Sequence, residues 1–340
     1  MQKKYLRWVV YLVGLLVLLV ASVILSLSVG EMNLGFFDIF SILSQGNDSM
    51  EYTILSQIRI PRILLGIAVG GALSLSGILL QGVYRNPLVE PYTLGISGGA
   101  SLGVAFAIVF GLHQLIGSFV LPLTGFAGAF LIIFLVYTIS SRSGRINIQS
   151  MLLTGVMVSF IASSSMMLLM ATSSSENLHG IVFWIMGSLD EPDMSLIYII
   201  LVMALVSLAA SYFFVQPLNA LRLGEEKAKH LGINTDITIK LLFLMASLLT
   251  GVCVAVAGVI GFVGLIIPHL MRLLVGSDYR ILLVSSFLSG AIFLVLSDVI
   301  ARTIISPNEL PIGVITGIIG GVVFLLMMSR SSHRTLKNNG

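Results

Sequence analysis

Long apolar runs, separated by short polar breaks or breaks that contain Gly or Pro, follow one another along nearly the whole chain. A run of about 20 residues, as a helix that rises about 1.5 Å per residue, crosses the ~30 Å hydrocarbon core of a bilayer. The pattern therefore predicts a bundle of membrane-spanning helices. The clear runs lie near 8–28, 60–82, 93–112, 117–139, 150–171, 195–215, 281–300 and 310–329.

The apolar stretch 238–275 is too long for one untilted span. It contains several residues at which a helix can break, and two spans joined by a tight turn are expected here. With the eight clear runs this gives about ten transmembrane helices, so the chain is predicted to be an all-α polytopic membrane protein with a single transmembrane domain, 1–340. The residues that offer a break are Gly258, Gly261, Gly264 and Pro268.

The distribution of basic residues predicts the orientation in the cell membrane. Lys and Arg concentrate on the cytoplasmic side of membrane proteins, so two basic ends place both termini in the cytoplasm and require an even number of crossings. The segments 29–56 and 173–193, expected outside, contain acidic residues but no Lys or Arg. The basic residues at the two ends are Lys3, Lys4, Arg7, Arg330, Arg334 and Lys337.

Composition excludes a soluble domain. Hydrophobic residues make up 57% of the chain and charged residues only 10%, against roughly 25% charged in a soluble domain. The run 8–28 exceeds a signal-peptide core and is not followed by a convincing cleavage site, so it is expected to remain as the first span. With one cysteine, Cys253, and no pair of histidines at ligand spacing, neither a disulfide framework nor a metal site is expected.

Glycines recur at four-residue intervals in two of the spans. This spacing places them on one face of a helix, and in lipid such faces let two helix backbones approach closely. Close helix packing is therefore the function predicted for Gly95, Gly99, Gly103, Gly313, Gly317 and Gly321.

The segment 95–99, GISGG, also fits the G-x-S-x-G pattern of a hydrolase nucleophile elbow, with Ser97 as the nucleophile. That elbow needs a strand before the serine and a helix after it, and nothing around Ser97 indicates a strand. The alternative from another class is an intramembrane serine protease that uses Ser97 and His269. Ser97 lies close to the basic turn at Arg85, and ten spans exceed what such an enzyme needs, so packing is the preferred interpretation.

Few polar side chains interrupt the spans. Thr154, Ser159 and Ser163 lie on the fifth run beside several methionines, and they are interpreted either as ordinary helix packing or as a mildly polar lining of a transport pathway. Asp298 and Arg302 stand four apart at the end of another run. They are expected to pair with each other first and to act in transport second.

Arg59 and Arg62 are rare basic residues near the outer end of the second span. Two roles are open for them. They contact an acidic patch of an extracytoplasmic protein or an anionic substrate, or they anchor the span at the headgroups and pair with nearby acids.

The longest polar cytoplasmic stretch before the C-terminal tail is 217–236. It is predicted to form one short helix that ends at a glycine, with acidic residues near its start and basic residues near its end. Its apolar side chains favour docking to another protein over simple packing against the membrane face. No G-x-x-x-x-G-K-[ST] motif occurs, so ATP-driven work must come from a separate subunit. The residues expected to couple to that subunit are Leu221, Gly224, Glu225, Glu226, Lys227, Ala228, Lys229, His230, Leu231 and Gly232.

Five stretches together resemble the FecCD-type permease subunits of type II ABC importers, a family that includes iron-siderophore, haem and vitamin B12 importers. The resemblance covers about 50–329 in the same order along the chain. The stretches are RIPRILLGIAVGGALSLSGILLQGVYRNPLVEPYTLGISGGASLG (59–103), LRLGEEKAKHLGI (221–233), GFVGLIIPHLMRLLVGSDYRILL (261–283), SDVIAR (297–302) and ELPIGVITGIIGG (309–321).

The resemblance implies the partners of the chain. A second copy or a close paralogue completes the pathway, two cytoplasmic ATPase subunits receive 221–233 as a coupling helix, and an extracytoplasmic binding protein delivers substrate. Spans five and ten are expected to line the pathway. The chain itself is expected to bind no cofactor and no metal, to lie among membrane lipid without a nucleic-acid partner, and to leave ATP and magnesium to the ATPase.

The expected function is inward transport of a metal chelate, in the first place an iron-siderophore. Haem, cobalamin and molybdate are the alternatives within the family. A secondary transporter is the third class considered, but it would be expected to carry ionisable residues deep in its spans. Apart from Asp298, near the end of a span, this chain has almost none.

Overall fold

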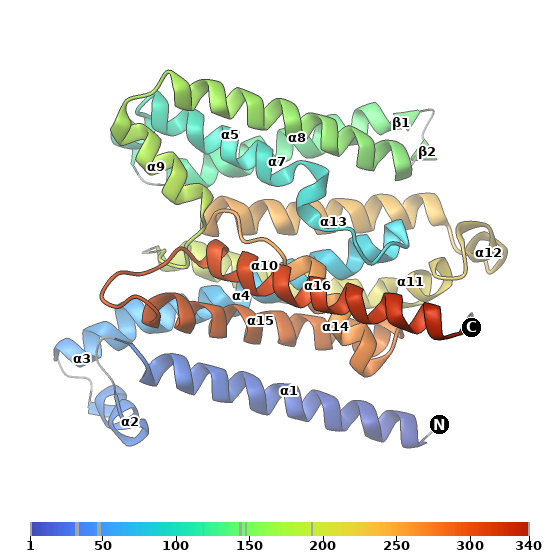
Figure 1. The fold of residues 1–340 in the computed structure, drawn as a ribbon, viewed down its shortest axis with the longest axis horizontal. Coiled ribbons are helices and arrows are strands. Elements are labelled where there is room, and N and C mark those ends of the chain that lie inside the picture. The colour runs from blue at the N-terminus through green and yellow to red at the C-terminus, as the bar shows by residue number, and fades with distance from the viewer. Residues whose placement is uncertain are drawn as a thin grey trace.

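A computed structural model describes residues 2–30, 34–45, 49–117, 119–142, 145–146, 148–191 and 193–338. The long helices lie side by side with their axes roughly aligned, so the molecule is a helical bundle (Figure 1). The helices are α1 Gln2–Ser28, α2 Phe36–Gln45, α3 Met50–Thr53, α4 Ile60–Tyr84, α5 Ile96–Val109, α6 Leu112–Ile116, α7 Val120–Ser140, α8 Ile148–Ala171, α9 Ser175–Ile185, α10 Met194–Ser211, α11 Val215–Leu221, α12 Glu225–His230, α13 Thr235–Ala257, α14 Val263–Val275, α15 Tyr279–Thr303 and α16 Ile312–Asn338. A π-helical turn, Ile54–Arg59, joins α3 to α4, two 3-10 turns cover Pro91–Leu94 and Tyr212–Phe214, and β1 Ser141–Arg142 pairs with β2 Arg145–Ile146.

Eight helical segments in the described residues are long and apolar enough to cross a membrane, which confirms a polytopic all-α protein. Two further apolar helices are shorter, α5 with 14 residues and α14 with 13. At 1.5 Å per residue each extends only about 20 Å, less than a full crossing. The count of ten spans therefore stays a prediction. The eight segments are Lys3–Ser28, Met50–Tyr84, Val120–Ser140, Ile148–Ala171, Met194–Leu221, Thr235–Ala257, Tyr279–Thr303 and Ile312–Ser329.

Helix α4 forms the centre of the bundle and packs against α10, α13, α14 and α15. Glycines make this possible. A Cβ atom at Gly70 would collide with the carbonyl oxygen of Gly290 on α15, and one at Gly77 with that of Gly264 on α14. The backbones thus approach closely at two crossings, as expected where packing rather than the hydrophobic effect holds membrane helices together.

The predicted break inside 238–275 lies at residues 258–262, between α13 and α14. Gly258 has φ of +69°, and Phe262 has the same φ, which is uncommon for a residue with a side chain. Hydrogen bonds from the 85–95 segment hold this break: the Phe262 amide donates to Glu90 Oε1 at 2.7 Å, and the Tyr92 hydroxyl donates to the Ile260 carbonyl at 3.0 Å. Pro268, which also offered a break, lies inside α14.

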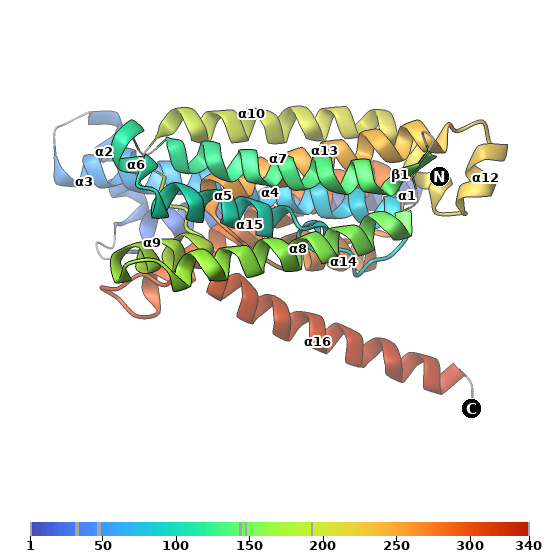
Figure 2. The same cartoon turned by 90° about the horizontal axis from the view of Figure 1, so that it is seen from above.

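A second group of helices, α5, α7, α8 and α9, lies along one side of this centre (Figure 1). Helix α5 packs mainly against α7 and α8, and α7 also contacts α13. Helix α1 lies at the opposite edge, beside α15, and α16 diverges from the body of the bundle (Figure 2). The two ends of the chain and α12 lie toward one end of the bundle, and α2, α3 and α9 toward the other.

Candidate functional site

The end of the bundle opposite the termini contains a compact group of charged residues, the outer charge cluster: Arg59, Arg62, Asp298, Arg302 and Glu309. Arg62, on α4, makes a two-pronged ion pair with Glu309, which lies in the loop before α16. Its Nη1 is 2.9 Å from Glu309 Oε1, and its Nη2 is 2.8 Å from Oε2. The Nη2 atom is also 3.4 Å from Asp298 Oδ1 on α15. One guanidinium therefore connects α4 to α15 and to the loop that follows α15.

The pairing expected between Asp298 and Arg302 is confirmed, with Arg302 Nε 2.9 Å from Asp298 Oδ2. Arg302 also donates to Ser26 Oγ at 2.9 Å, and Arg59 donates to the Leu27 carbonyl. Both of these acceptors belong to the end of α1. The outer charge cluster therefore fastens α1 to α4 and α15.

The arginines of this cluster are buried. Arg59 is 4% exposed, Arg62 8% and Arg302 9%, whereas the Glu309 side chain is 48% exposed. Of the two roles open for Arg62, the structure shows pairing with nearby acids. Arg59 faces a carbonyl of its own chain and is not presented on a surface where a second protein would meet it.

A cavity of about 540 Å³ opens beside the outer charge cluster. Its walls come from α9, the α15–α16 loop and the outer ends of α4 and α15, and they are mostly apolar. The polar residues that line it include Arg62, Glu176, Asn177, Asp298 and Glu309. A solute that enters from this end of the bundle meets more acidic than basic groups there.

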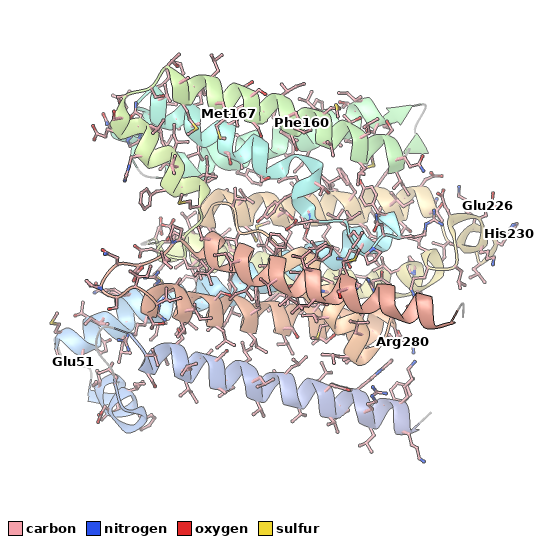
Figure 3. The ribbon with its side chains drawn as sticks, viewed as in Figure 1. Glu51, Phe160, Met167, Glu226, His230 and Arg280 are labelled. Carbon is pink, nitrogen blue, oxygen red and sulfur yellow. The ribbon has the colours of Figure 1, made fainter. Side chains whose placement is uncertain are left out.

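Of the three polar residues of α8 that were expected to line a pathway, two pack against other parts of this chain. Ser140 Oγ donates to Thr154 Oγ1 at 3.3 Å, so Thr154 is paired with α7. A Cβ atom at Gly95 would lie 3.0 Å from Ser159 Oγ, so Ser159 packs against the start of α5. Ser163 is half-buried. The exposed side of α8 is mostly apolar and carries Phe160 and Met167 (Figure 3). Met167 is one of the methionines noted on this span from the sequence, whereas Phe160 was not selected.

The segment 217–236 is formed by two short helices, most of α11 and all of α12, before α13 begins, and the expectation of one helix was wrong. Gly224 separates them with φ of +110°, a conformation that residues with a Cβ rarely adopt. Gly232, with φ of +83°, follows α12, close to where the sequence predicted a stop. The two glycines therefore make α12 a separate, projecting turn of helix at the end of the molecule (Figure 1).

The apolar residues of this segment divide into two sets. Leu221 and Ala228 are buried against each other and fix the fold of the segment, whereas Leu223 is 58% exposed and Leu231 is 63% exposed. The predicted i, i+4 pair is present, with Lys229 Nζ 2.9 Å from Glu225 Oε1. Glu226, Lys227 and His230 are exposed, and Figure 3 shows Glu226 and His230 at the tip. Exposed leucines beside exposed charged side chains fit a surface that another protein covers.

The glycines predicted to pack helices together do not all behave alike. A Cβ atom at Gly99 or Gly103 would collide with α7, and one at Gly313 with the Met186 carbonyl. Gly95 adopts φ of +83° before α5. A Cβ atom at Gly317 or Gly321 would meet nothing within 4 Å, whereas one at Gly320 would collide with Phe262, so these two glycines lie on the face of α16 that points away from the rest of the chain. Within this chain the packing role predicted for those two residues is therefore not observed.

Ser97 and His269 form no catalytic pair. Ser97 lies in the first turn of α5, and the segment before it is a 3-10 turn, not a strand. The Nδ1 atom of His269, on α14, is buried without a hydrogen-bond partner in the described part of the chain. A nucleophile elbow or a Ser–His dyad needs these groups to be bonded.

Ser97→Ala should therefore leave the protein assembled and active in transport. Gly99→Leu should disrupt it, because the new side chain would overlap Ile132 and the Gly128 backbone; overpacking typically costs about 1–3 kcal/mol, and a backbone clash costs more. Gly14→Leu is the matched control, since no atom lies within 4 Å of a Cβ there. Size-exclusion profiles of the detergent-solubilised variants measure the result. A monodisperse Gly99→Leu protein at normal yield would contradict the assignment.

Comparison with known proteins agrees with this architecture. The family model described as the FecCD transport family matches residues 18–330. The chain is 40% identical to an uncharacterized ABC transporter permease protein, YvrB, of Bacillus subtilis, with 96% of this chain and 95% of that protein aligned. It is 37% identical to the hemin transport system permease protein HmuU of Yersinia pestis, with 94% and 95% aligned.

A solved structure of a metal-chelate type ABC transporter in an inward-facing conformation is similar over the whole fold. The TM-score is 0.82 and the sequence identity 33%, with 95% of this chain and 99% of that chain covered. The chain therefore belongs to the FecCD transport family, and it is a membrane-embedded transport subunit and not an enzyme.

Proposed function

We propose that this chain is the permease subunit of an ABC importer that moves an iron-siderophore across the cytoplasmic membrane. The observation that carries the proposal is the projecting helix α12, where Leu223 and Leu231 are exposed beyond the apolar body of the bundle. Apolar side chains exposed to water are stabilised when a partner buries them, and two of them flank the same projecting helix. Two cytoplasmic ATPase subunits, which bind ATP and magnesium, are the partners that fit this position.

The proposed mechanism follows from how α12 is attached to the bundle. ATP binding closes the ATPase pair, and α12 passes the motion to α11, where Leu221 packs against Ala228, and to α13, which α12 also contacts. Helices α4, α13 and α15 pack through buried surfaces and move as units. The outward-facing cavity and an inward-facing one are then exposed alternately.

A second copy of the chain completes the pathway in this proposal. Helix α16 diverges from the bundle, and Gly317 and Gly321 lie against open space, while the exposed side of α8 is apolar. These are the fifth and tenth predicted spans. A homodimer, or a pair with a close paralogue, would enclose the pathway between the two chains. An extracytoplasmic binding protein would deliver substrate to the end with the outer charge cluster.

The substrate proposal is tested with the reconstituted importer and its binding protein. Uptake into vesicles is compared for an iron-siderophore, haem and cobalamin at equal concentration. ATP is supplied either on the side of the membrane that carries the ATPase subunits or, as a control, on the other side. ATP-dependent uptake of the siderophore above the other two is expected. Because a haem permease is a close relative, preferential uptake of haem is the specific alternative result, and it would replace the siderophore in this proposal.

The orientation proposal, with both termini and α12 in the cytoplasm, is tested by cysteine labelling in a Cys253→Ala background. The native thiol is buried and contributes little labelling. A cysteine at Ser175, exposed at the start of α9, should react with an impermeant reagent in intact cells. One at Lys227, exposed on α12, should react only after permeabilisation. Labelling of the Lys227 site in intact cells would reverse the orientation.

A further inference from the structure

A cleft of about 510 Å³ lies between the first turns of α1 and the end of α14. It is far from the outer charge cluster, at the end of the bundle that carries the N-terminus (Figure 1). Its residues combine two chemistries: three basic side chains on α1 and an apolar floor on α14. The lining residues are Lys3, Lys4, Arg7, Trp8, Leu273, Leu274, Val275 and Gly276.

The basic groups outnumber the acids at this cleft. No lining residue is acidic, and among the described residues the carboxylate that pairs with the cleft is that of Asp278, whose Oδ2 lies 3.1 Å from Lys4 Nζ. Arg7 donates to the Leu274 carbonyl at 3.3 Å, which directs its guanidinium across the cleft and leaves further N–H donors available. Three positive charges against one negative charge leave a local excess of two.

Aromatic residues place this cleft at the depth of the lipid headgroups. The Trp8 ring packs edge-on against Tyr5, with centroids 5.4 Å apart, and Lys4 Nζ lies 4.6 Å from the Trp8 ring centroid. Trp and Tyr concentrate at the membrane–water boundary, and Lys and Arg extend from there toward water.

The surroundings of the cleft suit acyl chains. Leu273 is 65% exposed, and on α1 the neighbouring Leu6 and Val10 are 65% and 64% exposed. Of the most apolar stretch of α1, only 11% of the residues are buried within the chain, so α1 faces lipid along most of its length. A ligand here is therefore a molecule with an anionic head and an apolar tail.

We infer that the cleft binds the headgroup of an anionic phospholipid, with Lys3, Lys4 and Arg7 around the phosphate and the acyl chains along Leu273 and α1. A zwitterionic lipid carries its own ammonium group and gains less from the excess positive charge. Basic pockets between membrane helices bind acidic headgroups in this way, at roughly a fivefold gain in affinity for each basic residue near the surface. By holding α1 and α14 together, the lipid supports the end of the bundle from which α12 projects.

The chain provides its own reporter for a test, because Trp8 is one of only two tryptophans. The other, Trp184, lies in the wall of the outer cavity. In a full-length Trp184→Phe protein, reconstituted in nanodiscs, Trp8 fluorescence is measured while brominated phosphatidylglycerol or brominated phosphatidylcholine is titrated over the same range of mole fractions. The anionic lipid should quench Trp8 at a several-fold lower mole fraction than the zwitterionic lipid.

The Lys3→Gln/Arg7→Gln double variant should abolish that preference. The matched control is Lys227→Gln/Arg280→Gln, which removes the same charge from exposed positions outside the cleft and should keep it. Equal quenching by the two lipids in the parent protein would overturn the proposal, as would a preference that survives loss of Lys3 and Arg7. Inorganic phosphate should not relieve the quenching; if it does, the cleft is a site for a free anion instead of a lipid.

A second measurement covers the case in which Trp184→Phe fails to fold. Native mass spectrometry of the unaltered chain, released from mixed phosphatidylglycerol and phosphatidylcholine, should retain phosphatidylglycerol. The Lys3→Gln/Arg7→Gln variant should retain several-fold less of it, and the Lys227→Gln/Arg280→Gln control as much as the parent. Retention of the two lipids in proportion to their abundance would overturn the assignment independently of fluorescence.

Discussion

A Leu231→Asp permease should lose its ATPase subunits and remain a folded membrane protein. Leu231 is 63% exposed in this chain, and its contribution to the turn after α12 is made by its backbone amide, which donates to the carbonyls of Lys227 and Ala228. The substitution therefore costs the isolated chain little. In a covered interface the new carboxylate is desolvated without a partner, at a cost of about 2–5 kcal/mol, which is roughly 30-fold or more in affinity.

Copurification of the ATPase with the tagged permease measures this effect, together with the size-exclusion profile of the permease alone. Leu115→Asp is the matched control, because Leu115 is 79% exposed on the short helix α6 at the other end of the bundle. That variant should retain the ATPase. If Leu231→Asp retained a full complement of ATPase and full transport, α12 would not be the coupling helix, although the family would be unchanged.

The membrane helices were predictable because their signal is local. A run such as 60–82 carries its own apolar length, and the structure places α4 at Ile60–Tyr84. The break between α13 and α14 was also predictable, because glycine at 258 permits the φ of +69° that it adopts. In both cases residues near in sequence determine the backbone, so no knowledge of distant contacts is needed.

Residues near in sequence do not determine which of several possible break points the chain uses. Gly258, Gly261, Gly264 and Pro268 all offered one, and the helix α14 begins where Glu90 and Tyr92 bind the backbone of residues 260–262. In the stretch 85–103 the sequence pattern drew attention to the glycines and Ser97 but not to these two residues. The EPY residues of that segment are a clamp for α14, and the signal that would have found them is an acid and a tyrosine in an otherwise apolar stretch.

Spacing also predicts which residues share a helix face but not how deep the face lies. Asp298 and Arg302 pair as expected, yet spacing gave no indication that Arg62 joins them, because its other partner, Glu309, is 247 positions away. The same limit applies to α8, where Thr154 and Ser159 turn out to face the chain itself. Pattern alone identifies polar residues in a span without showing which neighbour satisfies them.

Arg62→Gln should destabilise the permease and reduce transport. The substitution removes both hydrogen-bonded contacts to Glu309. It also removes one of the two arginines that contact the buried Asp298. Loss of one partner from a fully buried ion pair costs about 3–5 kcal/mol. Here Glu309 is half-exposed and turns to water, and Arg302 still holds Asp298, so the expected cost is smaller, about 2 kcal/mol. The thermal unfolding midpoint of the purified permease should fall accordingly.

A double variant separates this structural role from a docking role for the same arginine. In Arg62→Gln/Glu309→Gln two amides replace the ion pair and can bond to each other, so part of the lost stability should return as a coupling energy between the two positions. Arg280→Gln, which removes an arginine exposed at the other end of the bundle (Figure 3), should leave the unfolding midpoint unchanged. If Arg62→Gln leaves the midpoint unchanged but weakens capture of the binding protein, Arg62 acts mainly by docking. If the midpoint falls and the double variant restores it together with transport, the arginine works by fastening the α15–α16 loop to α4, and the binding protein must find its contacts on the exposed acids around the cavity.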